Sequence, residues 1–193
     1  MNNMSKKRIT TRMITIVALC IGINYLGGTI ALWLRLPIYL DSIGTIFAGT
    51  LLGPLFGLLT GLISGVLSGV TTDIFSLYYS PVQIVTGLLA GILFHGRLYQ
   101  NKNRWTLIFW ALILSIPGTI ISSLITVKLF GGITSSGSSM IVQVLHGLGI
   151  NQIISTILVQ IGTDYLDRLL SLLVVTLVVV SLIKRGHKLK SFS

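Results

Sequence analysis

The sequence predicts an all-α polytopic membrane protein, a six-transmembrane-helix bundle with a re-entrant or extra helical segment before the last span. Three observations lead to this fold class. Of the 193 residues, 52% are hydrophobic and only 9% are charged, whereas a soluble domain carries about 25% charged residues. The mean hydropathy is +0.91. The basic residues flank the apolar stretches, as cytoplasmic anchors of membrane helices do.

A spanning helix needs about 20 mostly apolar residues. We therefore expect one membrane domain over residues 1–193, with spans at about 12–33, 41–52, 55–70, 81–95, 105–128 and 165–184. The second and third spans are short, so they are expected to tilt or to lie where the protein is thin. The first apolar stretch is too long for a signal-peptide core and lacks a small-residue cleavage motif, so we expect it to be a retained helix.

The stretch 140–160 is apolar but interrupted by polar residues, so it is expected to pack inside the protein or to re-enter from the outer side. Its polar side chains belong to Gln143, His146, Asn151, Gln152 and Gln160. The segment 131–140 is rich in Gly and Ser and is expected to be a loop.

The charges predict the orientation. Eleven of the 14 Lys and Arg residues lie in the N-terminal segment, in the 96–104 loop or near the C-terminus. If these segments are cytoplasmic, the chain crosses the membrane an even number of times and both termini are cytoplasmic. The other charged residues are expected at outer helix ends or loops: Arg35, Lys128, Arg168, Asp41, Asp73, Asp164 and Asp167. Asp41 is either the N-cap of the helix that follows it or a ligand contact.

Glycine recurs at every fourth position of the third span, where residues four apart share one helix face. The positions are Gly53, Gly57, Gly61, Gly65 and Gly69. Because association of helices in lipid depends on close backbone approach, this face predicts tight packing against a neighbouring helix. The neighbour is either internal, which is the simpler interpretation, or another subunit.

The sequence shows no catalytic, metal or cofactor site. His95, His146 and His187 are far apart, and no phosphate-binding loop or nucleophile motif is present. The chain is thus predicted not to be an enzyme and to need no cofactor. Since the basic residues sit at the edges of apolar stretches, nucleic-acid binding is not expected either. The single cysteine, Cys20, is expected to be a buried small apolar residue.

The stretch 36–57, LPIYLDSIGTIFAGTLLGPLFG, leads from an expected outer loop through a short helix and a Leu-Gly-Pro turn into the glycine-rich helix. With its length, six expected spans and basic ends, the chain resembles the substrate-binding S components of energy-coupling factor (ECF) transporters, which import vitamins into prokaryotes. The family usually carries an Ala-x-x-x-Ala pair in the first helix, which docks on the coupling subunit. Ala18 and Gly22 occupy the matching positions; the glycine departs from the family pattern.

The resemblance implies a mechanism and a location in the prokaryotic plasma membrane. An S component binds its vitamin near the outer face and then topples in the membrane, so that the pocket opens inward. Toppling is driven by association with a transmembrane coupling subunit and two ATPase subunits, which are separate chains.

A pocket for a small polar molecule needs aromatic walls and a few convergent hydrogen-bonding groups. We hypothesise that it is lined by Asn24, Trp33, Tyr39, Asp41, Tyr79, Gln83, His146, Asn151 and Gln152. Pantothenate fits hydrogen-bonding groups beside Arg35 or Lys128, and a nucleoside fits aromatic walls with Asp41 on the ribose. Pantothenate is the preferred candidate, although Asp41 and Asp73 would repel an anion. The rival function is a membrane sensor or structural domain without a ligand; a membrane-embedded enzyme comes third.

Overall fold

The structure, a computed structural model, describes residues 9–95 and 105–184, and these residues form helices and no strand. The basic residues within 1–8, 96–104 and 185–193 lie outside the described residues. The predicted all-α membrane fold is confirmed. The helices are α1 Thr11–Trp33, α2 Ile43–Leu52, α3 Pro54–Thr71, α4 Ile74–Tyr78, α5 Ser80–Phe94, α6 Trp105–Phe130, α7 Ser138–Gly147 and α8 Gln152–Lys184.

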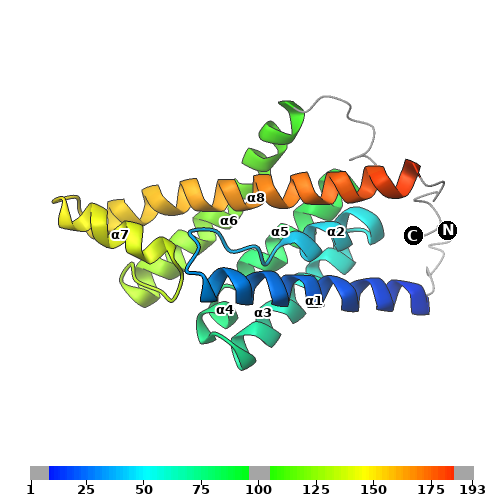
Figure 1. The fold of residues 1–193 in the computed structure, drawn as a ribbon, viewed down its shortest axis with the longest axis horizontal. Helices are drawn as coiled ribbons and strands as arrows, with labels where there is room; N and C mark the ends of the chain where they lie inside the picture. The colour runs from blue at the N-terminus through cyan, green and yellow to red at the C-terminus, as the bar shows by residue number, and fades with distance from the viewer. Residues whose placement is uncertain (1–8, 96–104, 185–193) are drawn as a thin grey trace, which may run out of the picture.

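Four of these helices, α1, α3, α6 and α8, are long and apolar enough to cross a membrane, and α2 and α5 are shorter apolar helices. Large apolar side chains such as Leu19, Leu112 and Leu177 are exposed along the long helices, as a surface in contact with lipid requires. The start of α1 and the end of α8 lie at the same end of the bundle (Figure 1). The six apolar helices thus form the bundle that the sequence predicts.

The structure differs from the expected helix boundaries near the C-terminus. The chain turns at residues 148–151, and α8 then runs without a break for 33 residues, Gln152–Lys184. The expected boundary near residue 165 is absent, and Asp164, Asp167 and Arg168 lie in the middle of α8 rather than at a helix end. They do not end the helix because their side chains are hydrogen-bonded or ion-paired inside the bundle. Figure 1 shows α8 along the full length of the molecule, with α7 packed at its start.

The glycine face of α3 lies against α5. A Cβ atom on Gly57 would come within 2.3 Å of the Gly87 carbonyl oxygen, and one on Gly61 within 2.4 Å of the Gln83 carbonyl oxygen. Gly87 of α5 is equally close to the backbone of α3. The two backbones therefore meet directly, which only glycine permits. The neighbour of this face is therefore α5 of the same chain, which is the simpler of the two interpretations.

A single residue, Gly53, separates α2 from α3. It has a φ of +102°, a conformation that favours glycine, and Pro54 occupies the first turn of α3, where its missing N–H costs nothing. This tight turn places α2 alongside α3 and α5.

Apolar and polar interiors occupy opposite ends of the bundle. The apolar core gathers residues from the start of α1 and α6 and from the end of α5 and α8, among them Met13, Phe94, Leu107 and Val179. The buried polar residues of α8, from Ser155 to Ser171, precede its share of the core. They face the end where the loop after α1, the turn around α4 and the loop after α6 come together (Figure 1).

Candidate functional site

A polar cavity opens between these loops, with an empty volume of about 880 Å³ that includes space open to the outside. We call it the polar cavity. Its walls come from α1 and the loop that follows it, from the end of α3 and the segment around α4, from α5, from α6 and the loop after it, and from α8. The lining residues are Gly28, Ala31, Leu32, Leu36, Ile38, Tyr39, Asp41, Ser68, Thr72, Asp73, Phe75, Ser76, Tyr79, Val82, Gln83, Ser122, Thr134, Ser135, Ser136, Asp164 and Arg168.

The inner wall contains a buried ion pair on α8. The Arg168 guanidinium lies 2.8 Å from the Asp167 Oδ2 atom, and the residues are 4% and 0% exposed. The other carboxylate oxygen of Asp167 accepts hydrogen bonds from the backbone N–H groups of Tyr39, at 3.2 Å, and Leu40, at 2.7 Å. Leu40 adopts a φ of +55°, which is uncommon for a residue with a side chain. Asp167 thus fastens the loop after α1 to α8 and offsets the strain of that turn.

Ser42, which is fully buried, connects the ion pair to the cavity wall. Its hydroxyl oxygen accepts hydrogen bonds from Arg168 Nη1 and from Gln83 Nε2, the latter at 3.3 Å. The hydroxyl reaches two carboxylates, Asp41 Oδ1 at 3.0 Å and Asp167 Oδ2 at 3.2 Å. Since a hydroxyl has one hydrogen, it donates to one of them at a time.

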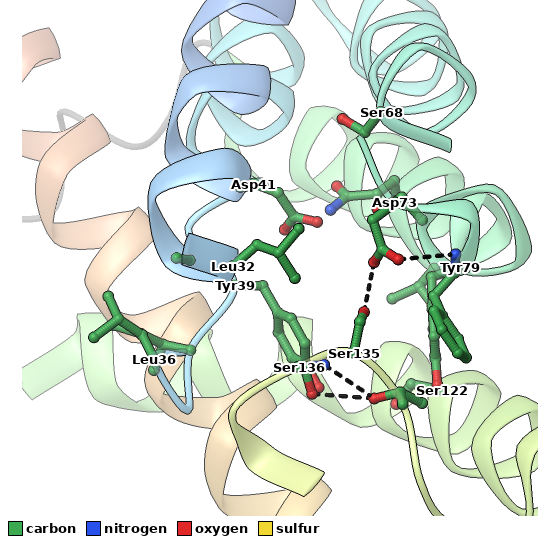
Figure 2. A pocket seen from close by; sticks show the side chains of 18 of the residues that line it. Leu32, Leu36, Tyr39, Asp41, Ser68, Asp73, Tyr79, Ser122, Ser135 and Ser136 are labelled. Atoms are coloured by element: carbon green, nitrogen blue, oxygen red, sulfur yellow. Dashed lines mark hydrogen bonds between the residues drawn. The ribbon is translucent and has the colours of Figure 1, made fainter. Parts of the chain in front are cut away.

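Asp41 lies on the cavity side of this cluster (Figure 2). It is not the N-cap of α2; that position belongs to Ser42, whose side chain makes no capping hydrogen bond. Burial and, to a smaller extent, the neighbouring Asp167 carboxylate raise the pKa of Asp41 from 3.8 to about 6, while Arg168 acts in the opposite direction. Asp41 is therefore mostly ionised at neutral pH.

A second set of polar contacts joins α8 to α6 and the loop after α6 to α4. Asp164, 5% exposed, accepts a hydrogen bond from the Ser122 hydroxyl at 2.8 Å. Asp73 accepts one from the Ser135 hydroxyl at 2.6 Å and caps α4 through the Phe75 N–H, as Figure 2 shows. The first contact joins α6 to α8, and the hydrogen bond between Ser135 and Asp73 connects the loop after α6 to the start of α4.

The tyrosines complete the wall. The Tyr79 hydroxyl pairs with the Thr126 hydroxyl at 2.5 Å, and the Tyr39 hydroxyl with that of Ser138 at 3.3 Å. Burial raises the pKa of Tyr79 to about 12, and it raises the pKa of Tyr39 as well. Both phenols therefore stay neutral at physiological pH and act as hydrogen-bonding groups.

The structure brings together four of the nine residues proposed from sequence: Tyr39, Asp41, Tyr79 and Gln83 line the polar cavity. Asn24 lies beside it, facing a smaller hollow that shares some of the same walls. The Asn24 side chain donates to the hydroxyls of Thr45 and Ser64, at 2.8 and 3.0 Å, and accepts from the Gly44 N–H at 2.7 Å. Asn24 thus holds α1, α2 and α3 together.

The other four residues do not line the polar cavity. Trp33 is 81% exposed at the end of α1. His146 is exposed, and its ring lies 3.1 Å from the Ile150 carbonyl oxygen. Asn151 accepts from the Ile153 N–H in the first turn of α8, and Gln152 donates to the Gly131 carbonyl oxygen. The contacts of His146, Asn151 and Gln152 therefore stabilise the turn at 148–151 and the start of α8.

Sequence reasoning did not assign Asp73, Asp164, Arg168 and the loop serines to the pocket. A signal for the α8 residues was present in the spacing of its polar side chains. Gln160, Asp164 and Arg168 are four residues apart and therefore lie on one helix face, and all three are buried. An amphipathic pattern of this kind, with polar residues inward and leucines outward, indicates a polar interior rather than a helix end.

The comparisons with known proteins agree with this architecture. The family model of the ECF transporter substrate-specific component matches residues 12–186. No curated protein and no solved structure gives a match. Because the family match covers most of the chain, the protein belongs to the family of ECF transporter substrate-specific components and is a substrate-binding membrane subunit.

Proposed function

We propose that this subunit captures a small polar molecule in the polar cavity on the outer side of the membrane and delivers it inward. The observation that carries this proposal is the position of the cavity, which lies towards the bundle end away from the start of α1 and the end of α8. Basic residues cluster in the terminal segments and in the 96–104 loop. This clustering favours a cytoplasmic location for the bundle end that holds the start of α1 and the end of α8. The cavity would then open outward.

The proposed transport cycle needs partners that supply energy. Membership of the family implies association with the membrane and ATPase subunits of an ECF module. We propose that docking on the coupling subunit makes the whole bundle topple, so that the loaded cavity turns towards the cytoplasm. The apolar surface of the long helices supports this motion, because it can remain in contact with lipid throughout.

The proposed substrate is a vitamin or vitamin precursor. The cavity combines aromatic walls, Tyr39, Phe75 and Tyr79, with several hydroxyl, amide and carboxylate groups, as sites for small polar molecules do. Pantothenate is the candidate named from the sequence; within this cavity its carboxylate would have to lie against Arg168. A nucleoside-type ligand is the alternative, with its hydroxyls on Asp41. A ligand-free homodimer would instead support a sensor or structural role.

Removing the Gln83 amide is expected to weaken substrate binding about tenfold or more, because Gln83 is a buried polar group of the cavity wall. The test is mass spectrometry of the small molecule that co-purifies with the subunit, followed by its affinity for the Gln83→Ala variant. Asn151→Ala is the control, since this exposed side chain lies outside the cavity. Equal affinity of the wild type and Gln83→Ala for the co-purified molecule would contradict the proposed site.

The proposed docking face on α1 is open in the isolated subunit. Ala18 is exposed, and a Cβ on Gly22 would meet nothing within 4 Å. We expect Gly22→Leu to leave the melting temperature of the isolated subunit unchanged but to reduce its recovery in a complex with a co-expressed ECF module at least about tenfold, since a leucine blocks close helix approach. Gly162→Leu, at an equally open position of α8, is the matched control. Normal assembly of the Gly22→Leu subunit would place docking elsewhere.

A further inference from the structure

The charges that line the polar cavity do not balance. Three lining residues, Asp41, Asp73 and Asp164, carry carboxylates, and one, Arg168, carries a guanidinium. The charge of Arg168 is already matched by Asp167, with which it forms an ion pair at 2.8 Å. Within residues 9–95 and 105–184, none of the three lining carboxylates forms an ion pair. The cavity wall therefore has an excess of negative charge.

The direct hydrogen-bond donors to these carboxylates are neutral groups, and Arg168, which also lowers the pKa of Asp41, is the one cation near them among the described residues. The described partners of Asp41, Asp73 and Asp164 are the hydroxyls of Ser42, Ser135 and Ser122, together with one backbone N–H at Asp73. An ionised carboxylate that is removed from water needs a counter-charge as well as hydrogen bonds. Burial as deep as that of Asp164, which is 5% exposed, favours the neutral form of a carboxyl group, so the requirement applies to Asp41 and Asp73.

Two of the lining residues each have a buried atom with unmet hydrogen-bonding capacity. Gln83 Oε1, an acceptor, and Arg168 Nε, a donor, are buried and have no partner among the described residues. Gln83 and Arg168 are 6% and 4% exposed, so their unpaired atoms are costly. The described cavity wall therefore provides no donor for Gln83 Oε1 and no further counter-charge for its carboxylates. The N–H group of Arg168 Nε likewise lacks an acceptor among these residues.

We infer that the polar cavity takes a small organic cation that carries N–H donors, such as a protonated amine attached to an aromatic ring. Its positive charge would lie near Asp41 and Asp73, and an N–H group would donate to Gln83. The lining rings of Tyr39, Phe75 and Tyr79 suit a flat cationic ligand, since aromatic faces attract cations. The inference rests on the proposed function and narrows its substrate class: it disfavours pantothenate, whose carboxylate would find no uncompensated cation in the wall.

Matched probes test the sign of the charge. Pyridoxamine and pyridoxine differ by an ammonium in place of a hydroxyl, and pantothenate and pantothenol by a carboxylate in place of an alcohol. Binding of each to the purified full-length subunit is measured by calorimetry near neutral pH, together with the charge of any molecule extracted from it. We expect pyridoxamine to bind at least about tenfold more tightly than pyridoxine, since one added cation faces several carboxylates, and pantothenol to bind more tightly than pantothenate.

The outcomes separate the inference from the proposed function. A co-purified anion, or tighter binding of pantothenate than of pantothenol, would overturn the inference and leave small-molecule capture intact. The same holds for equal binding of pyridoxamine and pyridoxine. If nothing is extracted and no probe binds, both the inference and the proposed capture function fail.

The pH dependence gives a second measurement. Asp41 faces Asp167 and Arg168 of α8, Gln83 of α5 and its neighbour Ser42. Because the ionised form attracts a cation, affinity for pyridoxamine is expected to fall about tenfold between pH 7.5 and 5, as Asp41 takes up a proton. Asp41→Asn keeps the shape of the side chain and should bind weakly with a flat pH profile. Lys128→Gln, a charge change at an exposed residue outside the cavity, should behave as wild type; a flat wild-type profile would contradict the role of Asp41.

Discussion

Gly57→Val is expected to destabilise the helix bundle strongly. A Cβ at residue 57 would lie 2.3 Å from the Gly87 carbonyl oxygen and 2.8 Å from the Gly49 Cα atom. Both are backbone atoms of packed helices, so neither can rotate away as a side chain would. Overpacking of this kind costs about 3 kcal/mol or more, which corresponds to a fall of about 10 °C in melting temperature for a chain of this size. Thermal unfolding in detergent and the yield of monodisperse protein measure the effect.

The control separates steric overlap from the general effect of valine in a membrane helix. A Cβ at Gly162 of α8 meets nothing within 4 Å, so Gly162→Val should leave the melting temperature within about 2 °C of the wild type. A Gly57→Val protein as stable as Gly162→Val would mean that α3 and α5 are not in backbone contact.

Asp167→Asn is expected to destabilise the subunit by about 3 kcal/mol, the cost of breaking a buried ion pair by removing one partner. Arg168 would remain 4% exposed beside a neutral amide. The loop after α1 would also lose the charge-assisted hydrogen bonds that Tyr39 and Leu40 donate to the carboxylate. We expect a lower melting temperature and faster hydrogen exchange at the Tyr39 and Leu40 amides.

The double variant Asp167→Asn with Arg168→Gln tests the reason for this loss. It removes both charges, so no guanidinium is left without its ion-pair partner, and part of the lost stability should return. Exchange at the two loop amides should stay fast, because a neutral amide holds them more weakly. If the double variant were as unstable as the single one, the uncompensated guanidinium would not be the cause.

The parts of the fold that follow from local patterns were predictable from the sequence. The apolar stretches fix the helices, Gly53-Pro54 fixes the turn between α2 and α3, and the four-residue glycine spacing indicates a face for close packing. The start of the last helix, expected at about 165, lies at Gln152 instead. Charged residues in an apolar stretch indicate a helix end when the side chains that pair with them inside the bundle are not known.

The site was less predictable because its contacts connect residues that are far apart in the chain. Asp167 holds the N–H groups of Tyr39 and Leu40, more than 100 positions earlier. A single sequence does not reveal such pairs, since neither residue has a local pattern that requires the other. Tyr39 and Asp41, two of the predicted residues that line the polar cavity, lie within the recognisable stretch 36–57. The position of Asp164 and Arg168 on the cavity wall depends on the uninterrupted α8, which the sequence did not predict.

The lone hydrogen of Ser42 makes two regions of the protein interdependent. When the Ser42 hydroxyl donates to Asp41, at 3.0 Å, Asp167 holds the loop after α1 without that hydrogen bond. When a bound ligand donates to Asp41 instead, the Ser42 hydroxyl is free to donate to Asp167, at 3.2 Å. Ligand binding would then add a hydrogen bond between the loop after α1 and Asp167 of α8. This change needs only the rotation of the Ser42 hydroxyl and no movement of a helix.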